Sequence, residues 1–233
     1  MHNITLVKDL KDIYGENLVS VIIYGENIEQ EYSKSQSVIV IFNKLEASDL
    51  KIAITAMKKW RKTKNPLPIV MSEIEWFSSA DVYPIEYTEI KNNHEILYGK
   101  NVVVPIAVSK HDLRLQCEYE IKNILVRIRQ IYLGNSDNPQ FMVKTLEETS
   151  TKLVRILKSA LSLFDVPAPE EYSEVIQRMA QKTSFDGEIF VEILSAKENK
   201  RKFAPQKIES LVQRSINSTD LLYKFINNLD NGE

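Results

Sequence analysis

With 233 residues, the chain is long enough for one large domain or two modest ones, each with its own hydrophobic core. Hydrophobic residues make up 43% of the chain and charged residues 27%, as in an ordinary soluble globular protein. A net charge of −2 excludes a global electrostatic attraction to nucleic acid or to an anionic membrane. The sequence has one cysteine, no N-terminal signal region and no apolar run long enough to span a bilayer, so we expect a cytoplasmic protein without disulfides.

The first part of the chain alternates between helical and strand patterns. Apolar residues at helical spacing predict a short amphipathic helix over 4–13 and a second helix over 50–62. Alternating or continuous apolar runs predict four strands, over 18–24, 37–42, 69–71 and 82–90. This order predicts an α/β (α+β) domain with a mixed sheet over residues 1–105.

After Pro105 the strand patterns end and long helical patterns replace them. Apolar stripes predict long helices around 113–131, 142–164 and 208–229, with shorter helices over 170–182 and 187–196. Residues 106–233 are therefore expected to form an all-α helical bundle. Cys117 falls on the apolar face of the first long helix, which favours a buried thiol over a nucleophile.

The most informative segment surrounds Gly25, where two apolar strands flank a turn. This arrangement resembles the nucleotidyltransferase fold, whose signature is a strand, a Gly-Ser turn and an Asp-x-Asp pair on the following strand. Gly25 stands where the family's glycine stands, and Glu26 replaces the serine. Ser37 and Ile39 fall where the two aspartates should be. The resemblance implies nucleotide-binding positions at Gly25, Glu26 and Ser37, with a degenerate motif.

The replacements change the chemistry that this segment can perform. Nucleotidyl transfer joins two anions, so it needs divalent cations to neutralise the triphosphate, and magnesium takes oxygen ligands that include carboxylates. Ser37 offers only a neutral hydroxyl, Ile39 offers no ligand, and Glu26 would repel phosphate beside Gly25. The sequence therefore predicts a poor site for magnesium-ATP, and we expect no cofactor, with magnesium required only if the protein is active.

A third carboxylate of the family lies on a later strand, and the predicted strand 82–90 offers Glu86 as the catalytic candidate. Glu86 alternates with Ile85 and Tyr87, so it would face a cleft if these neighbours face the core. The alternative is that Glu86 lies on a solvated face of the strand. Trp76, just before this segment, is interpreted either as a core residue or as a platform for a base.

An α/β nucleotidyltransferase-like domain followed by a helical bundle is similar to aminoglycoside nucleotidyltransferases over nearly the whole chain. The segments 96–99 and 127–133 look like the sequences at the domain junction and on the first bundle helix of that family. The resemblance implies that the bundle forms one wall of a cleft between the domains, which would accept a small-molecule or protein ligand. Arg129 is the substrate-binding candidate there, against the alternative of a solvated helix face.

These observations support three hypotheses. The first is a catalytically degenerate nucleotidyltransferase-like protein that binds a ligand or partner and is not an enzyme. The second is an active nucleotidyltransferase that transfers a nucleotide from a nucleoside triphosphate to a small molecule or protein through other carboxylates: Glu26, Glu29, Glu31, Glu73 or Glu75 with Glu86. The third is a nucleic-acid-associated adaptor that uses the basic run 197–202, which lacks aromatic residues for base stacking. The sequence leaves open which ligand is bound and whether the protein forms a homo-oligomer.

Overall fold

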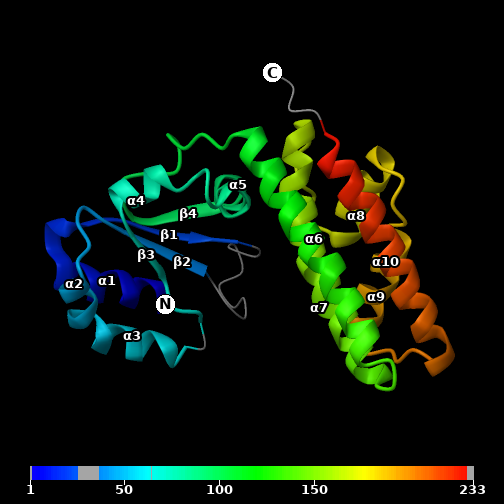
Figure 1. Cartoon of the computed structure of the whole chain (residues 1–233). Coiled ribbons are helices and arrows are strands. Elements are labelled where there is room, and N and C mark those ends of the chain that lie inside the picture. The colour runs from blue at the N-terminus through cyan, green and yellow to red at the C-terminus, as the bar shows by residue number, and fades with distance from the viewer. Residues whose placement is uncertain (1, 26–36, 64, 230–233) are drawn as a thin grey trace. The chain divides into compact units, whose positions relative to one another are not determined.

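The computed structural model describes residues 2–25, 37–63 and 65–229. The chain divides into two compact units, Met1–Val108 and Ser109–Glu233, and each is described by itself. Figure 1 shows the first unit as a small sheet with helices on both faces and the second as a group of helices. Among the described residues, no helix combines the length and hydrophobicity that a bilayer crossing requires.

Among the described residues of the first unit, the sheet has four strands in the order β3-β2-β1-β4. These strands are β1 (Leu18–Tyr24), β2 (Ser37–Phe42), β3 (Ile69–Ser72) and β4 (His94–Gly99). β1 pairs antiparallel with both β2 and β4, whereas β2 pairs parallel with β3, so the predicted mixed sheet is confirmed. β1 and β2 are nearly all buried, as expected for the two central strands of a sheet covered on both faces.

Each face of the sheet has its own apolar cluster. One face packs against α1 (His2–Tyr14) and α3 (Ile54–Arg61), which contribute Leu6, Leu10 and Trp60. The other packs against α4 (Glu73–Ser78), α5 (Pro84–Asn92) and the segment 102–106. α2 (Ala47–Ile52) and the short 3-10 helix η1 (Gly15–Asn17) complete the unit. The helix predicted over 50–62 is divided at Ala53 into α2 and α3.

The strand predicted over 82–90 is wrong, because this segment forms helix α5. Pro84 occupies the first turn, where its missing N–H costs no intrahelical hydrogen bond. Glu86 follows in the same turn, where the helix dipole interacts favourably with a carboxylate. The strand lies further along the chain, at β4. Most residues of α5 are buried, so its apolar residues are not confined to one helical face. Their pattern in the sequence can therefore be mistaken for the alternation of a strand.

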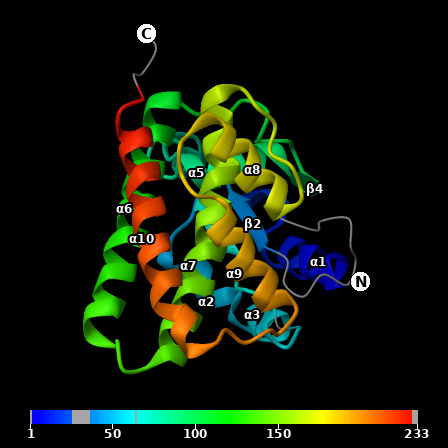
Figure 2. The same ribbon diagram turned by 90° about the vertical axis from the view of Figure 1, so that its right-hand side faces the viewer.

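The second unit, as far as residue 229, contains three long helices and two short ones, as the apolar stripes predict. The long helices are α6 (Lys110–Gly134), α7 (Pro139–Ala160) and α10 (Pro205–Asn227), and the short ones are α8 (Tyr172–Lys182) and α9 (Glu188–Glu198). A short 3-10 helix, η2 (Leu161–Phe164), follows α7. α6, α7 and α10 run side by side in Figure 2 and contact one another. Cys117 on α6 is fully buried, which confirms the prediction, and burial raises the pKa of its thiol to about 12.

Candidate functional site

Three strands meet at the end of the sheet that carries Gly25. β1 ends there, whereas β2 and β4 begin there, because both run antiparallel to β1. Tyr24 pairs with Ser37 on one side and with His94 on the other. Since directly paired residues project from the same face of a sheet, these three half-buried side chains form one row at its end.

Ile39 lies in the second row inward on the same face, paired with Ile22. Its exposed fraction is 1%, and it belongs to the apolar cluster that also contains Trp76 and Tyr87. A side chain in this place contacts hydrocarbon and aromatic rings and no water. The position that the resemblance assigns to the second aspartate is therefore part of the hydrophobic core.

Trp76 and Tyr87 close this face of the sheet. Their rings stack with centroids 4.5 Å apart, and the Tyr87 hydroxyl donates a hydrogen bond of 2.6 Å to the Trp76 carbonyl oxygen. The Trp76 indole N–H donates to the carbonyl oxygen of Val102 at 2.9 Å. Burial raises the pKa of Tyr87 to about 12. Trp76 is thus a core residue and is not available to stack on a base, which resolves the two interpretations of this side chain.

Gly25 is joined to Asn93, the residue between α5 and β4. The Gly25 N–H donates to the Asn93 carbonyl oxygen at 3.3 Å, and the Asn93 side-chain amide donates to the Gly25 carbonyl oxygen at 2.6 Å. Gly25 has a φ of 103°, a conformation that favours glycine. A phosphate-binding turn offers free backbone N–H groups to the anion, but the N–H of Gly25 is already bonded.

A carboxylate also lies beside this glycine. A Cβ atom placed on Gly25 would be 3.7 Å from a carboxylate oxygen of Glu89. Glu86, Glu89 and Asn93 are three and four residues apart on α5 and its C-terminal cap, so they follow one face of the helix towards Gly25. Glu86 is therefore about one helical turn from Glu89, on a helix and not on a strand.

Sequence reasoning missed Glu89 and Asn93. The signal was the spacing of Glu86, Glu89 and Asn93, which is helical, but it becomes visible only when 84–92 is read as a helix. Glu26, the other expected nucleotide-binding position, lies outside the described residues.

The other carboxylates named for an active enzyme have separate roles where they are described. Glu73 forms an ion pair with Lys100. Glu75 caps α4 by accepting hydrogen bonds from the backbone N–H and hydroxyl of Ser72, and these bonds lower its pKa. Within 2–25, 37–63 and 65–229, no three His, Cys, Asp or Glu side chains gather in a way that suits a metal ion. Glu29 and Glu31 lie in the segment that is not described.

Arg129 belongs to α6 of the second unit. Its guanidinium contacts a carboxylate oxygen of Asp220 on α10 at 3.3 Å, and Lys224 contacts the other oxygen at 2.7 Å. The hydrogen bond from Lys224, together with the charges of Lys224 and Arg129, lowers the pKa of Asp220. Arg129 thus links two helices of the bundle.

Comparisons with known proteins identify the fold. No protein-family model matches the chain, and no curated protein matches it. The chain is similar in structure to the spectinomycin adenyltransferase AAD(9) from Enterococcus faecialis, which was crystallised with ATP and spectinomycin. The TM-score is 0.55 with 14% sequence identity, over 91% of this chain and 98% of that chain. The expected architecture, an α/β nucleotidyltransferase-like domain followed by a helical region, is confirmed.

Proposed function

Because the chain has a nucleotidyltransferase-like fold, we propose that it is a catalytically degenerate member of that fold, which binds a small-molecule or protein ligand without transferring a nucleotide. The observation that carries the proposal is Ile39, which occupies an expected aspartate position and is 1% exposed within an apolar cluster. A metal ligand must reach a hydrated cation, and this side chain has neither a ligand atom nor access to water.

The donor atoms around Ile39 do not compensate for it. Ser37, in the outer row, supplies one neutral hydroxyl, and Tyr24 and His94 complete that row. Magnesium prefers oxygen ligands that include carboxylates, and a two-metal centre needs several of them within about 4 Å of both cations. The described side chains of this row therefore do not fit the metal that nucleotidyl transfer uses.

The surroundings of Gly25 also disfavour a triphosphate. The N–H of Gly25 is bonded to the Asn93 carbonyl oxygen, so this backbone donor is not offered to a phosphate. The proposed role is thus recognition by a retained scaffold, with chemistry lost.

Isothermal titration with ATP, in the presence and in the absence of magnesium, tests the proposal. We expect no magnesium-dependent binding, and no pyrophosphate release when spectinomycin or another amino alcohol is added as acceptor. The spectinomycin adenyltransferase AAD(9), titrated under the same conditions, is the positive control. Micromolar binding that requires magnesium, with pyrophosphate release that Glu86→Gln abolishes, would overturn the proposal and favour the active transferase.

A further inference from the structure

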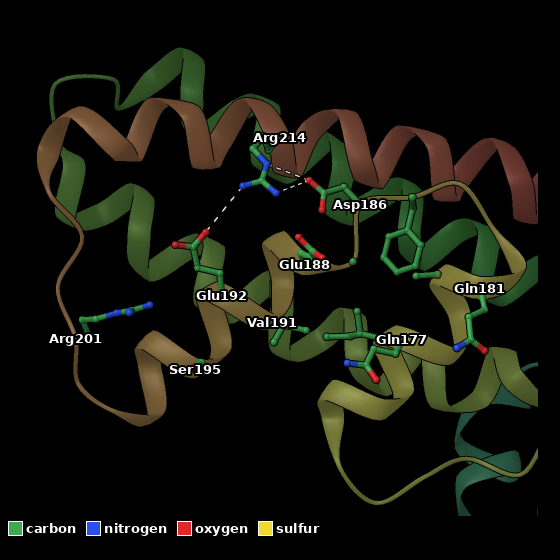
Figure 3. Close-up of a pocket in the computed structure, with 13 residues that line it drawn as sticks. Gln177, Gln181, Asp186, Glu188, Val191, Glu192, Ser195, Arg201 and Arg214 are labelled. Carbon is green, nitrogen blue, oxygen red and sulfur yellow. Dashed lines mark hydrogen bonds and ion pairs between the residues drawn. The ribbon is translucent and has the colours of Figure 1, made fainter.

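The helical unit contains a groove of about 790 Å³ whose lining residues all lie within 176–214. Figure 3 shows it between α8 and α9, with Arg214 of α10 on one side and Arg201, from the loop between α9 and α10, at one end. Its volume is in the range of small-ligand sites. α8 contributes Gln177 and Gln181, and α9 contributes residues at helical spacing that begin with Glu188 and end with Ser195.

Packing and ion pairs hold the walls of the groove in place. Gly187 lets α9 begin directly against α8, since a Cβ atom there would lie 2.6 Å from the side chain of Ile176. The guanidinium of Arg214 donates two hydrogen bonds to one carboxylate oxygen of Asp186, at 3.0 and 2.6 Å, and lies 3.9 Å from Glu192. Lys207 forms a second ion pair with Glu192. The groove is therefore preformed by contacts that do not need a ligand.

The charges around the groove cancel, but not all of them are paired. The carboxylates belong to Asp186, Glu188 and Glu192, and the cations to Arg201, Lys207 and Arg214. Asp186 and Glu192 neutralise Arg214 and Lys207. Within the described part of the chain, Glu188 and Arg201 form no ion pair, and both are exposed. One negative and one positive charge thus remain for a ligand, which suits a molecule that carries both signs.

The two unpaired charges lie at opposite ends of α9. Glu188 is its first residue, and the Arg201 N–H donates to the Ala196 carbonyl oxygen at 2.8 Å, which fixes Arg201 beside the last turn. In Figure 3 the Arg201 side chain extends from the loop towards α9, at the level of Glu192 and Ser195. With about 1.5 Å of rise per residue, the backbone positions that hold the two charges are about 12 Å apart along the helix.

A ligand that meets both charges must extend along α9. Three residues of an extended chain span about 10 Å, close to the separation of the two backbone positions, whereas a single amino acid spans only about 3.3 to 3.6 Å. Val191 and Ala180 offer small apolar surfaces between the charged ends, and Gln177 and Gln181 line the α8 wall with amides that can pair with peptide groups. We propose that this groove binds a short peptide of about three residues, with its amino terminus at Glu188 and its carboxylate at Arg201. The proposal is independent of the function proposed for the sheet.

Calorimetric titration with trialanine that has free termini tests this inference, with N-acetyl-trialanine amide as the matched probe without charges. We expect trialanine to bind and the blocked peptide to bind at least about tenfold more weakly, as expected for the loss of charge-assisted hydrogen bonds. Glu188→Gln and Arg201→Gln should each weaken trialanine binding by about tenfold. Both side chains are exposed, so Arg201→Gln should leave thermal unfolding unchanged, and Glu188→Gln should lower stability by at most about 1 kcal/mol through the lost interaction with the α9 dipole.

Lys202→Gln is the control, because Lys202 is the exposed neighbour of Arg201 and does not line the groove. It removes the same charge from the same loop and should leave binding unchanged. Absence of trialanine binding to the parent protein would overturn the inference. Equal binding of the free and blocked peptides, or an equal loss in Lys202→Gln and Arg201→Gln, would overturn it as well.

Discussion

Asn93 bonds Gly25 twice, once through its side-chain amide and once through its own carbonyl oxygen. The two residues are 68 positions apart in the chain, so this pair of hydrogen bonds fixes the end of β1 to the junction of α5 and β4. The turn after β1 is the segment to which the resemblance to nucleotidyltransferases assigns phosphate binding. Here its first residue is held by the protein itself.

Asn93→Ala should destabilise the protein by about 1 kcal/mol, because it removes the donor to the Gly25 carbonyl oxygen and leaves the backbone bond intact. Urea unfolding followed by circular dichroism measures the change. Asn92→Ala is the control, since Asn92 is the exposed last residue of α5. Equal stability of the two variants would show that the side chain of Asn93 contributes nothing.

Ile39→Asp should destabilise the protein by several kcal/mol at pH 7, because it places a carboxylate in an apolar cluster. Burial raises the pKa of such a carboxyl in the folded state, so the protonated form is favoured there and the loss of stability should grow as pH rises from 4 to 7. Ile39→Asn, which cannot ionise, should be destabilised without this trend. Unfolding curves at both pH values measure it, and a pH-independent loss in the aspartate variant would contradict burial.

Gly99→Ala should cost about 3 kcal/mol or more, or prevent folding, because the new methyl group would lie 2.0 Å from the carbonyl oxygen of Val19. Gly99 also has a φ of 81°, which disfavours any side chain. Gly134→Ala is the matched variant, since no atom lies within 4 Å of its added carbon, and it should be neutral or slightly stabilising. Thermal unfolding compares the two.

Tyr87→Phe should lose about 1 kcal/mol near neutral pH, the value of its hydrogen bond to Trp76. Burial raises the pKa of Tyr87 from 10.0 to about 12, so in the parent protein its protonated form adds stability below pH 10 that disappears as pH rises to about 12. The difference between parent and variant should therefore shrink over that interval. Urea unfolding of the parent protein and the variant from pH 8 upwards measures it.

The predictable part of the fold is the part with strong apolar periodicity. β1 and β2 are nearly continuous apolar runs, and the stripes of α6, α7 and α10 extend over many turns, so local sequence is sufficient. β4 was not predicted, because His94–Gly99 is a half-exposed edge strand whose pairing with β1 is a long-range contact. α5 was misassigned because its burial extends around most of the helix.

The candidate site was predictable only in part, for a related reason. Gly25 could be placed because it follows a clear strand, and Ser37 and Ile39 begin the next. The proximity of Asn93 and Glu89 to Gly25 depends on how α5 returns the chain to the sheet, which no local pattern of 84–93 specifies. Local sequence patterns predict the helix or strand in which a residue lies, but they do not predict which distant residue it contacts in the fold.

The central position of β1 has a consequence for synthesis of the chain. β2 follows β1 closely enough to pair with it while translation continues, but β4 emerges only after α2 to α5 have been made. One edge of β1, with its unpaired backbone N–H and C=O groups, therefore stays open during that time to chaperones and to pairing with other nascent chains.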